Sequence, residues 1–351
     1  MKHLLSVFAL FLFLHSDAAL WQVNNEPGAA ADFSSLTDAI SAASSGDTIY
    51  LYPGTNSYGN ITLNKQLFIL GTGHKVDYTT MTPLVGAITF TNGSTGTVIK
   101  GIRMWYITTP SGITSNDVLI SGCEIAAQNP FSLTGDAIMN AWIIEGCVVW
   151  NQSNGMAFNG PNVQNWILRN NIINLTSGSG EFIKYATNML VENNILIQTG
   201  SSAGNSIFGP QCTGVTFRDN IVYYTISIPL ANTMGSCTSC ILENNITYSP
   251  NTTLANLPGT NQNNTDPVFV NVPSSNPEFS YTKDFHLAAG SPAIGSGTAG
   301  DDIGVFGGIH AFRPEGWSNT MPRVGNLIPL NNSAPPGGQL LFNLKAGSAG
   351  N

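Results

Sequence analysis

The residues of this chain best suited to chemistry are charged side chains that recur at a nearly constant interval. Lys184 lies close to Glu181, and a lysine positioned in this way can act as a general base. Arg169 and Arg218 lie in a series of alternating charge, with Glu192 between them. Because a guanidinium binds carboxylates well, either arginine could bind an acidic sugar.

The same alternation also has a structural interpretation. The full series is Lys100, Ser121, Glu145, Arg169, Glu192, Arg218 and Glu243. If these positions stack in register, each acid lies beside a base, and cross-strand pairs of opposite charge contribute roughly 0.2 to 1 kcal/mol each. The series therefore predicts a column of surface ion pairs that fixes the register of the strands.

A short phrase recurs around these charges: an apolar residue, a variable residue, and then glycine, asparagine or aspartate. It occurs at 99–101, 120–122, 144–146, 168–170, 191–193, 217–219 and 242–244. Successive phrases lie 21 to 26 residues apart, and their neighbours are β-branched and alternate with polar residues. A strand-rich period in the twenties is typical of a solenoid.

Two columns of this repeat predict its turns. The third position holds only residues that tolerate positive φ, which predicts a tight bend there. In the next column Asn171, Asn194, Asn220 and Asn245 are expected to stack and to hydrogen bond along the axis, because buried amides must be paired. Unrelated Asn-Asn turns in an ordinary sandwich would explain the residue types but not the period.

The two ends of the repeat region complete the pattern. Phe33–Ile40 followed by Ser44–Gly54, and Phe285–Leu287 followed by Gly290–Ile294 and Asp302–Gly308, resemble the opening and closing segments of right-handed parallel β-helix proteins of the pectate-lyase-like superfamily. The resemblance covers about Phe33 to Gly308. It implies an all-β solenoid of about ten coils with an N-terminal capping α-helix. Ser34 or Ser35 as N-cap supports that helix.

The resemblance also implies a polysaccharide groove along one parallel sheet. Phe158, Lys184 and Tyr185 precede bends near that groove, with Glu181 close by and Glu192 on the outer face. A lyase on an acidic polymer would use Lys184 as base and a cation, calcium or an arginine, to neutralise the substrate carboxylate. The strand that precedes the bends has no cluster of aspartates, so we predict no metal site, and calcium enters only for a lyase.

Other candidates have simpler interpretations. The pair Asp301 and Asp302 lies in a glycine-rich closing turn, which favours a structural role over paired catalytic acids. Asp284 and His286 are also expected to close the fold. The spacing of the two tryptophans 142 and 166 favours stacked core residues over sugar platforms.

Composition limits location and partners. Residues 1–18 combine Lys2, an apolar run from Leu4 to Leu14 and small residues before a cleavage point, which predicts a signal peptide and no transmembrane segment after its removal. The net charge of -8 argues against nucleic acid as a partner. We expect a β-helix over 19–310 and a proline-rich extended tail over 311–351.

The repeat places four of the five cysteines in two neighbouring pairs. Cys123 aligns with Cys147, and Cys212 aligns with Cys237. Adjacent strands are close enough for disulfides, but stacked side chains point in parallel, so bridges and packed thiols both stay open. Cys240 is expected to be a core residue.

Together these features predict a secreted β-helix protein that binds extracellular polysaccharide along its solenoid face. One alternative is a lyase of acidic, uronate-containing polymers, with Lys184, Arg169 and Arg218 as catalytic residues. Another is a structural or adhesive surface component without a sugar ligand. The sequence does not decide whether the protein is an enzyme.

Overall fold

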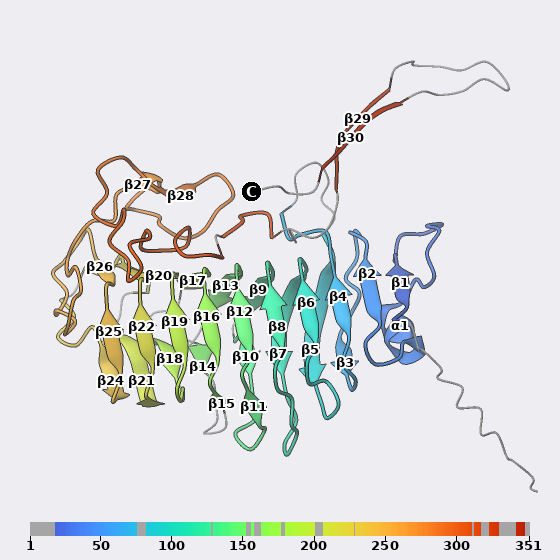
Figure 1. Ribbon diagram of the computed structural model, residues 1–351, viewed down its shortest axis with the longest axis horizontal. Coiled ribbons are helices and arrows are strands. Elements are labelled where there is room, and N and C mark those ends of the chain that lie inside the picture. The colour runs from blue at the N-terminus through green and yellow to red at the C-terminus, as the bar shows by residue number, and fades with distance from the viewer. Residues whose placement is uncertain are drawn as a thin grey trace, which may run out of the picture.

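The chain winds into a stack of about eight coils, somewhat fewer than the ten expected (Figure 1). The computed structural model describes residues 18–75, 82–127, 129–151, 156–157, 163–176, 180–200, 206–227, 229–310, 312–316, 323–329 and 342–347. The expected signal peptide falls almost wholly outside the described residues. The coils form a right-handed parallel β-helix, and the fold predicted from the sequence is confirmed.

Three parallel sheets run along the stack, and successive coils contribute short strands to them. Sheet 1 has the order β1 (Leu20–Val23), β2 (Thr48–Leu51), β4 (Phe68–Leu70), β6 (Val98–Lys100), β8 (Leu119–Ser121), β12 (Ile143–Glu145), β16 (Ile167–Arg169), β19 (Leu190–Glu192), β22 (Thr216–Arg218), β25 (Ile241–Glu243). Sheet 2 has the order β26 (Ile246–Tyr248), β23 (Ile221–Tyr224), β20 (Ile195–Gln198), β17 (Ile172–Leu175), β13 (Val148–Asn151), β9 (Glu124–Ala127), β7 (Arg103–Thr108), β5 (Leu84–Phe90), β3 (Ile61–Leu63), with β10 (Phe131–Ser132) also paired to β7. Sheet 3 has the order β14 (Met156–Ala157), β18 (Glu181–Lys184), β21 (Ser206–Thr213), β24 (Gly235–Thr238). β11 (Met139–Asn140) and β15 (Val163–Gln164) form a separate parallel pair.

Each coil bends at the column that the sequence predicts to be left-handed. The φ angles there lie between 51° and 64° at Gly101, Gly122, Gly146, Asn170, Asn193, Asp219 and Asn244. Glycine has no Cβ to clash in this region, and asparagine and aspartate tolerate it better than other residues. The predicted bend is therefore confirmed at all seven positions.

The asparagine ladder lies immediately after these bends. The side-chain oxygen of Asn194 accepts hydrogen bonds from the backbone N and the Nδ2 of Asn171 at 2.9 and 3.0 Å. Asn220 and Asn245 repeat this arrangement one coil further each time. The four amides are fully buried, and the ladder continues to Asn261, which the period did not predict. The predicted stacking is confirmed.

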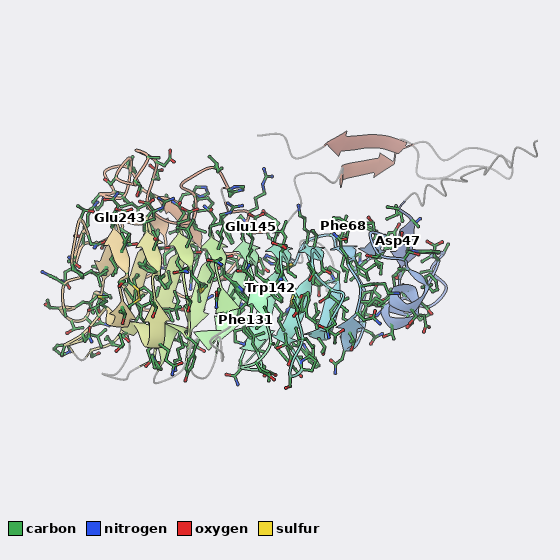
Figure 2. The ribbon with its side chains drawn as sticks, turned by 60° about the horizontal axis from the view of Figure 1, so that its bottom comes forward. Asp47, Phe68, Phe131, Trp142, Glu145 and Glu243 are labelled. Atoms are coloured by element: carbon green, nitrogen blue, oxygen red, sulfur yellow. A yellow bond between two sulfur atoms is a disulfide. The ribbon has the colours of Figure 1, made fainter. Side chains whose placement is uncertain are left out.

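The interior of the coils is an apolar core, and the middle residue of each three-residue strand of sheet 1, from β4 to β25, is buried there. The rings of Trp142 and Trp166 stack there with centroids 4.9 Å apart and planes 3° from parallel, and both are fully buried. Their indole N–H groups donate to the carbonyls of Ser115 and Met139. Figure 2 labels Trp142 among the strands of the central coils. The predicted core role of these tryptophans is confirmed.

The chain returns after the last coil and covers the outer face of sheet 2. β27 (Phe269–Asn271) and β28 (Asp284–Leu287) pair antiparallel, so this stretch does not add a further coil to the parallel stack. Apolar residues of this segment, including Phe279, Phe285 and Val305, pack on outward residues of sheet 2 such as Ile172 and Ile195. We call the segment from Phe269 to Phe312 the closing segment, and we call its apolar contact with sheet 2 the second core. In Figure 1 the segment lies above the coils.

Both ends of sheet 1 are closed by side chains. At the first strand, helix α1 (Leu36–Ala42) begins at the N-cap Ser35, and Asp32 accepts a hydrogen bond from the backbone N of Gln22 at 2.7 Å. At the last strand, Asn261 donates to the carbonyl of Leu242 at 3.0 Å. Such blocked edges oppose pairing with another chain.

The cysteines form one disulfide, and it differs from the aligned pairs. Cys237 is bonded to Cys240 with a Cα–Cα distance of 5.8 Å, while Cys123, Cys147 and Cys212 are free and buried. Cys212 is the register partner of Cys237, but stacked side chains point in parallel. Of the two alternatives left open for the aligned pairs, the structure therefore has packed thiols at Cys123, Cys147 and Cys212. Cys240 is half-buried and packs against the core, but it does so as part of a disulfide that the sequence did not predict.

Beyond the coils, the described parts of the tail form an antiparallel pair. β29 (Arg323–Pro329) pairs with β30 (Phe342–Gly347). Figure 1 draws this pair away from the coils. Among the described residues, no helix has the length and apolar character needed to cross a membrane.

Candidate functional site

The predicted site residues lie on two different sheets and are not brought together. Arg169, Glu192 and Arg218 end successive strands of sheet 1. Glu181 and Lys184 lie on β18 of sheet 3, and Tyr185 follows them with a φ of 57°. Phe158 lies outside the described residues. A single centre that uses Lys184 with both arginines is therefore not formed.

The charged column of sheet 1 forms two ion pairs. Arg169 Nη2 lies 2.7 Å from Glu145 Oε2, and Arg218 Nη2 lies 2.8 Å from Glu192 Oε2. In both pairs the Nε of the arginine donates to the same oxygen. Glu145 and Glu243 are labelled along this column in Figure 2. The predicted ion pairs are confirmed at these positions.

Reversing one charge of the column is expected to destabilise the fold. Glu192→Lys would place a third cation between Arg169 and Arg218, its register partners. The loss of one pair and the new repulsion should cost about 1 to 2 kcal/mol, or a melting temperature lower by about 3 °C. Glu192→Gln, which removes the charge at nearly constant shape, should cost about half as much. A melt of Glu192→Lys equal to that of the wild type would show that the column does not stabilise the coils.

A cleft of about 250 Å³ lies beside these pairs, under the closing segment. It is lined by Arg169, Asn170, Glu192, Asn193, Arg218, Asp219, Thr298, Ala299, Asp301, Gly308, Ile309 and His310. Acidic and basic groups are mixed, and both guanidiniums are bound to carboxylates. The cleft therefore has no excess of positive charge for an acidic sugar.

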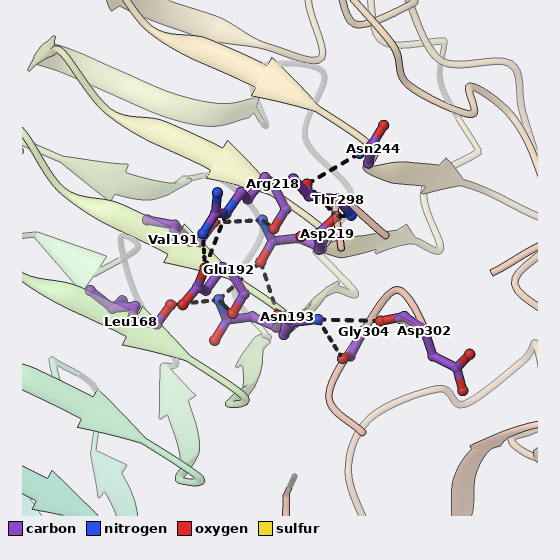
Figure 3. A network of polar contacts seen from close by, with 12 residues as sticks. Leu168, Val191, Glu192, Asn193, Arg218, Asp219, Asn244, Thr298, Asp302 and Gly304 are labelled. Carbon is purple, nitrogen blue, oxygen red and sulfur yellow. Dashed lines mark hydrogen bonds and ion pairs between the residues drawn. The ribbon is translucent and has the colours of Figure 1, made fainter. Parts of the chain in front are cut away.

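The bend residues beside this cleft bind the closing segment (Figure 3). Asn193 Nδ2 donates to the carbonyls of Asp302 and Gly304, at 3.3 and 3.4 Å. Asp219 Oδ1 accepts from the backbone N and the hydroxyl of Thr298, at 2.8 and 3.0 Å, while burial raises the pKa of this carboxyl. Asp302 itself accepts from the backbone N of Gly295. These contacts support the structural interpretation of the closing turn.

Lys184 is also bound to a carboxylate. Its Nζ lies 2.7 Å from Glu181 Oε2, and both side chains are mostly buried. Gly209 of the next strand gives them room, because a Cβ there would come within 2.7 Å of Lys184 Cγ. A shallow pocket of about 320 Å³ adjoins Glu181. The lysine could act as a base only after it loses its proton and its partner.

A third pocket, on sheet 2, contains none of the predicted residues. Its volume is about 510 Å³, and we call it the Trp105 pocket. It is lined by Trp105, Tyr106, Ala126, Ala127, Asn129 and Ser132. Trp105 is 48% exposed, in contrast to the buried Trp142 and Trp166. The lining has no charged side chain.

The pocket exists because β9 leaves β7 for a few residues. β9 pairs with β7 at Arg103 and Met104, and pairing resumes between β10 and β7 at Ile107. Met104 and Ile107 are both buried although they are three residues apart, so the strand departs from strict alternation at Trp105. In the sequence, the run from Met104 to Ile107 is apolar or aromatic throughout and does not alternate with polar residues. That run was the available signal for the site.

A polar cluster lies next to the Trp105 pocket. Glu124 is bound by Arg103, whose Nε lies 3.3 Å away, and by hydrogen bonds from Trp150 and Tyr281, while burial raises the pKa of its carboxyl. His74 Nδ1 lies 2.6 Å from the Tyr281 hydroxyl. The Tyr281 hydroxyl also lies 3.4 Å from the backbone carbonyl of His74, to which it donates. The cluster fixes the closing segment to the coil.

The buried imidazole of His74 predicts a pH dependence of stability. Burial, with a smaller effect of Arg103, lowers the pKa of His74 from 6.5 to about 3. The unfolded chain therefore binds a proton that the fold rejects, and stability is lost as pH falls from about 6.5 toward 3, by up to about 1.4 kcal/mol per pH unit. His74→Gln has no imidazole to protonate, so it lacks this pH-dependent loss of stability.

Thermal melts of the wild type and His74→Gln across this range provide the measurement. The difference between the two melting temperatures should shrink as the pH falls, because only the wild type carries the penalty. A difference that stays constant with pH would show that His74 accepts a proton in the fold.

Comparison with known proteins gives a likeness of fold. No protein-family model and no curated protein matches the sequence. Seven chains of solved structures match, among them the crystal structure of pectate lyase Pel9A, with a TM-score of 0.44, 12% identity, and coverage of 83% of this chain and 96% of that chain. The strand pairing establishes the parallel β-helix on its own. The resemblance predicted from the sequence therefore holds at the level of the fold.

None of the described residues form a group of three or more histidine, cysteine, aspartate or glutamate side chains that could hold a metal ion. The Trp105 pocket instead offers an aromatic face, two small residues, an amide and a hydroxyl. Such a surface binds by stacking and hydrogen bonding rather than by charge or metal coordination.

Proposed function

We propose that the protein is exported and binds extracellular polysaccharide through the Trp105 pocket. The observation that carries this proposal is a half-exposed indole in an uncharged pocket, on a protein whose other described tryptophans are more buried. An indole offers a large, rigid apolar face with a small loss of conformational freedom on binding. The C–H face of a sugar ring is a matching surface.

The other lining residues support a sugar as ligand. Ala126 and Ala127 leave free space beside the indole, while Asn129 and Ser132 provide polar groups for hydroxyls. The volume of about 510 Å³ lies within the usual range for small-ligand pockets. Because the lining carries no charge, the ligand expected here is a neutral sugar rather than a uronate.

The lyase alternative uses the predicted cations on the other sheets. Lys184, Arg169 and Arg218 are each bound to a glutamate in the free protein. Displacing these partners would cost part of the binding energy of an acidic polymer. A lyase that works through Lys184 should lose its activity in Lys184→Ala, whereas the proposed binding should be unchanged in that variant.

The structural alternative would need contacts between copies of the chain. Some outer hydrogen-bonding groups at the two ends of sheet 1 are already used: Gln22 O on β1 accepts from Phe33 N, and Asn244 N, directly after β25, donates to Thr260 O. These contacts disfavour end-to-end pairing of coils. A filament through strand edges therefore has less support than ligand binding.

One panel experiment separates these functions. Purified protein is applied to immobilised xylan, galactomannan, starch, polygalacturonate and alginate, and each soluble polymer is followed by ultraviolet absorbance for unsaturated products. We expect retention on at least one neutral polymer without such products. Absorbance that rises with an acidic polymer and disappears in Lys184→Ala would overturn the proposal in favour of the lyase.

A further inference from the structure

The Trp105 pocket is short because strand pairing closes it at both ends. β7 pairs with β9 up to Met104, opposite Ile125, and pairs with β10 from Ile107, opposite Phe131. Only Trp105 and Tyr106, between these positions, have no strand partner on the side of β7 that faces β9 and β10. At ~3.3 Å per residue, the opening spans about 10 Å between the flanking paired residues. A sugar chain cannot continue along the strands beyond either end without leaving the pocket.

A third side of the pocket is closed across the strands. Trp150 on β13 is the register partner of Ala126, packs against the second core and hydrogen bonds to Glu124. The next strand is already covered, because the backbone N of Phe279 donates to the buried side chain of Asn174 at 2.8 Å. A ligand on Trp105 therefore meets a wall one strand beyond Ala126, or about 10 Å away.

The polar cluster limits the pocket further. Tyr281, from the closing segment, lies over Glu124, which precedes Ala126 by two residues and so points to the same side of β9. Arg103 occupies the corresponding position on β7, two residues before Trp105. The outer face beside the pocket is therefore filled by side chains rather than open as a continuous groove.

These boundaries decide which part of a sugar chain fits. An interior residue of a polymer has a neighbour on each side, so it needs two exits from its binding site, whereas a terminal residue needs one. We propose that the Trp105 pocket binds the terminal residue of a neutral sugar chain, at a chain end or at the tip of a branch. This inference rests on the proposed function and adds the position in the polymer that is recognised.

The test varies the number of chain ends at constant mass. Xylan, galactomannan and starch are each compared intact and after limited acid hydrolysis, with ends counted by reducing-sugar assay and binding to the full-length protein measured by calorimetry. We expect the number of sites per gram of the bound polymer to rise in proportion to its ends. A capacity that stays constant while the ends increase tenfold would overturn the inference but leave polysaccharide binding intact.

Two variants complete the design. Trp150→Ala removes the wall and should raise the capacity of the intact polymer toward that of the hydrolysed one. Trp105→Ala should lose binding to both forms. If the wild type binds no polymer of the panel and is indistinguishable from Trp105→Ala, then the proposed function itself fails, and the terminal-residue inference falls with it.

Discussion

Asn194→Ala is expected to lower the free energy of unfolding by about 4 kcal/mol. The Asn194 side chain accepts from the backbone N and side chain of Asn171 and donates to the carbonyls of Leu168 and Glu192 and to the side chain of Asn220. Its removal leaves several buried polar groups without partners, at about 1 to 3 kcal/mol for each. Thermal unfolding should therefore begin roughly 8 °C lower.

The matched control for this change is Asn276→Ala. Asn276 is exposed, and its amide oxygen accepts a hydrogen bond from Lys283 at the surface. Its removal should cost less than about 0.5 kcal/mol. Equal melting temperatures for the two variants would mean that the ladder contributes no more than an ordinary surface contact.

Trp105→Ala is expected to weaken polysaccharide binding by about 30-fold or more. An aromatic side chain at the centre of a binding site commonly contributes about 2 kcal/mol or more, which corresponds to this factor. The fold should be little affected because nearly half of the side chain is already exposed. Calorimetry with a bound polymer of the panel gives the affinity, and a thermal melt gives the stability.

Two variants make this result specific. Trp105→Phe keeps an aromatic face and should retain most of the affinity, whereas Ile309→Ala, at a side chain 91% exposed on the closing segment, should change nothing. Unchanged affinity in Trp105→Ala would place the sugar elsewhere on the molecule.

The fold could be predicted because its determinants are local and repeat. The bend at Asn193 and the ladder residue Asn194 are adjacent, so one phrase specifies both the turn and the stacking. The two ion pairs followed from the same period. Asn261 was missed because it lies only 16 residues after Asn245, outside the interval of the other coils.

The candidate site could not be predicted in the same way because it departs from the repeat. Trp105 is exposed only where β9 separates from β7, and Trp142 and Trp166, which keep the period, are buried. The polar cluster joins His74 to Tyr281, 207 residues later in the chain. A contact of that separation depends on the return of the closing segment, which no local pattern specifies.

For the charged residues, the sequence showed which side chains could do chemistry but not all of the partners that occupy them. The period predicted a carboxylate partner for Arg218, but it did not reveal that Lys184 is neutralised by Glu181. Arg218 meets its partner through the register of neighbouring strands, whereas Glu181 lies on the same strand as Lys184, three residues earlier. A role for them in catalysis stays a prediction.

The most direct test of the proposed site is a crystal structure of the protein with an oligosaccharide of the polymer that it retains. We predict a terminal sugar ring stacked on the indole of Trp105, with its hydroxyls toward Asn129 and Ser132. A ring bound instead in the cleft of Arg169 and Arg218, or beside Lys184, with the Trp105 pocket empty, would contradict the proposal.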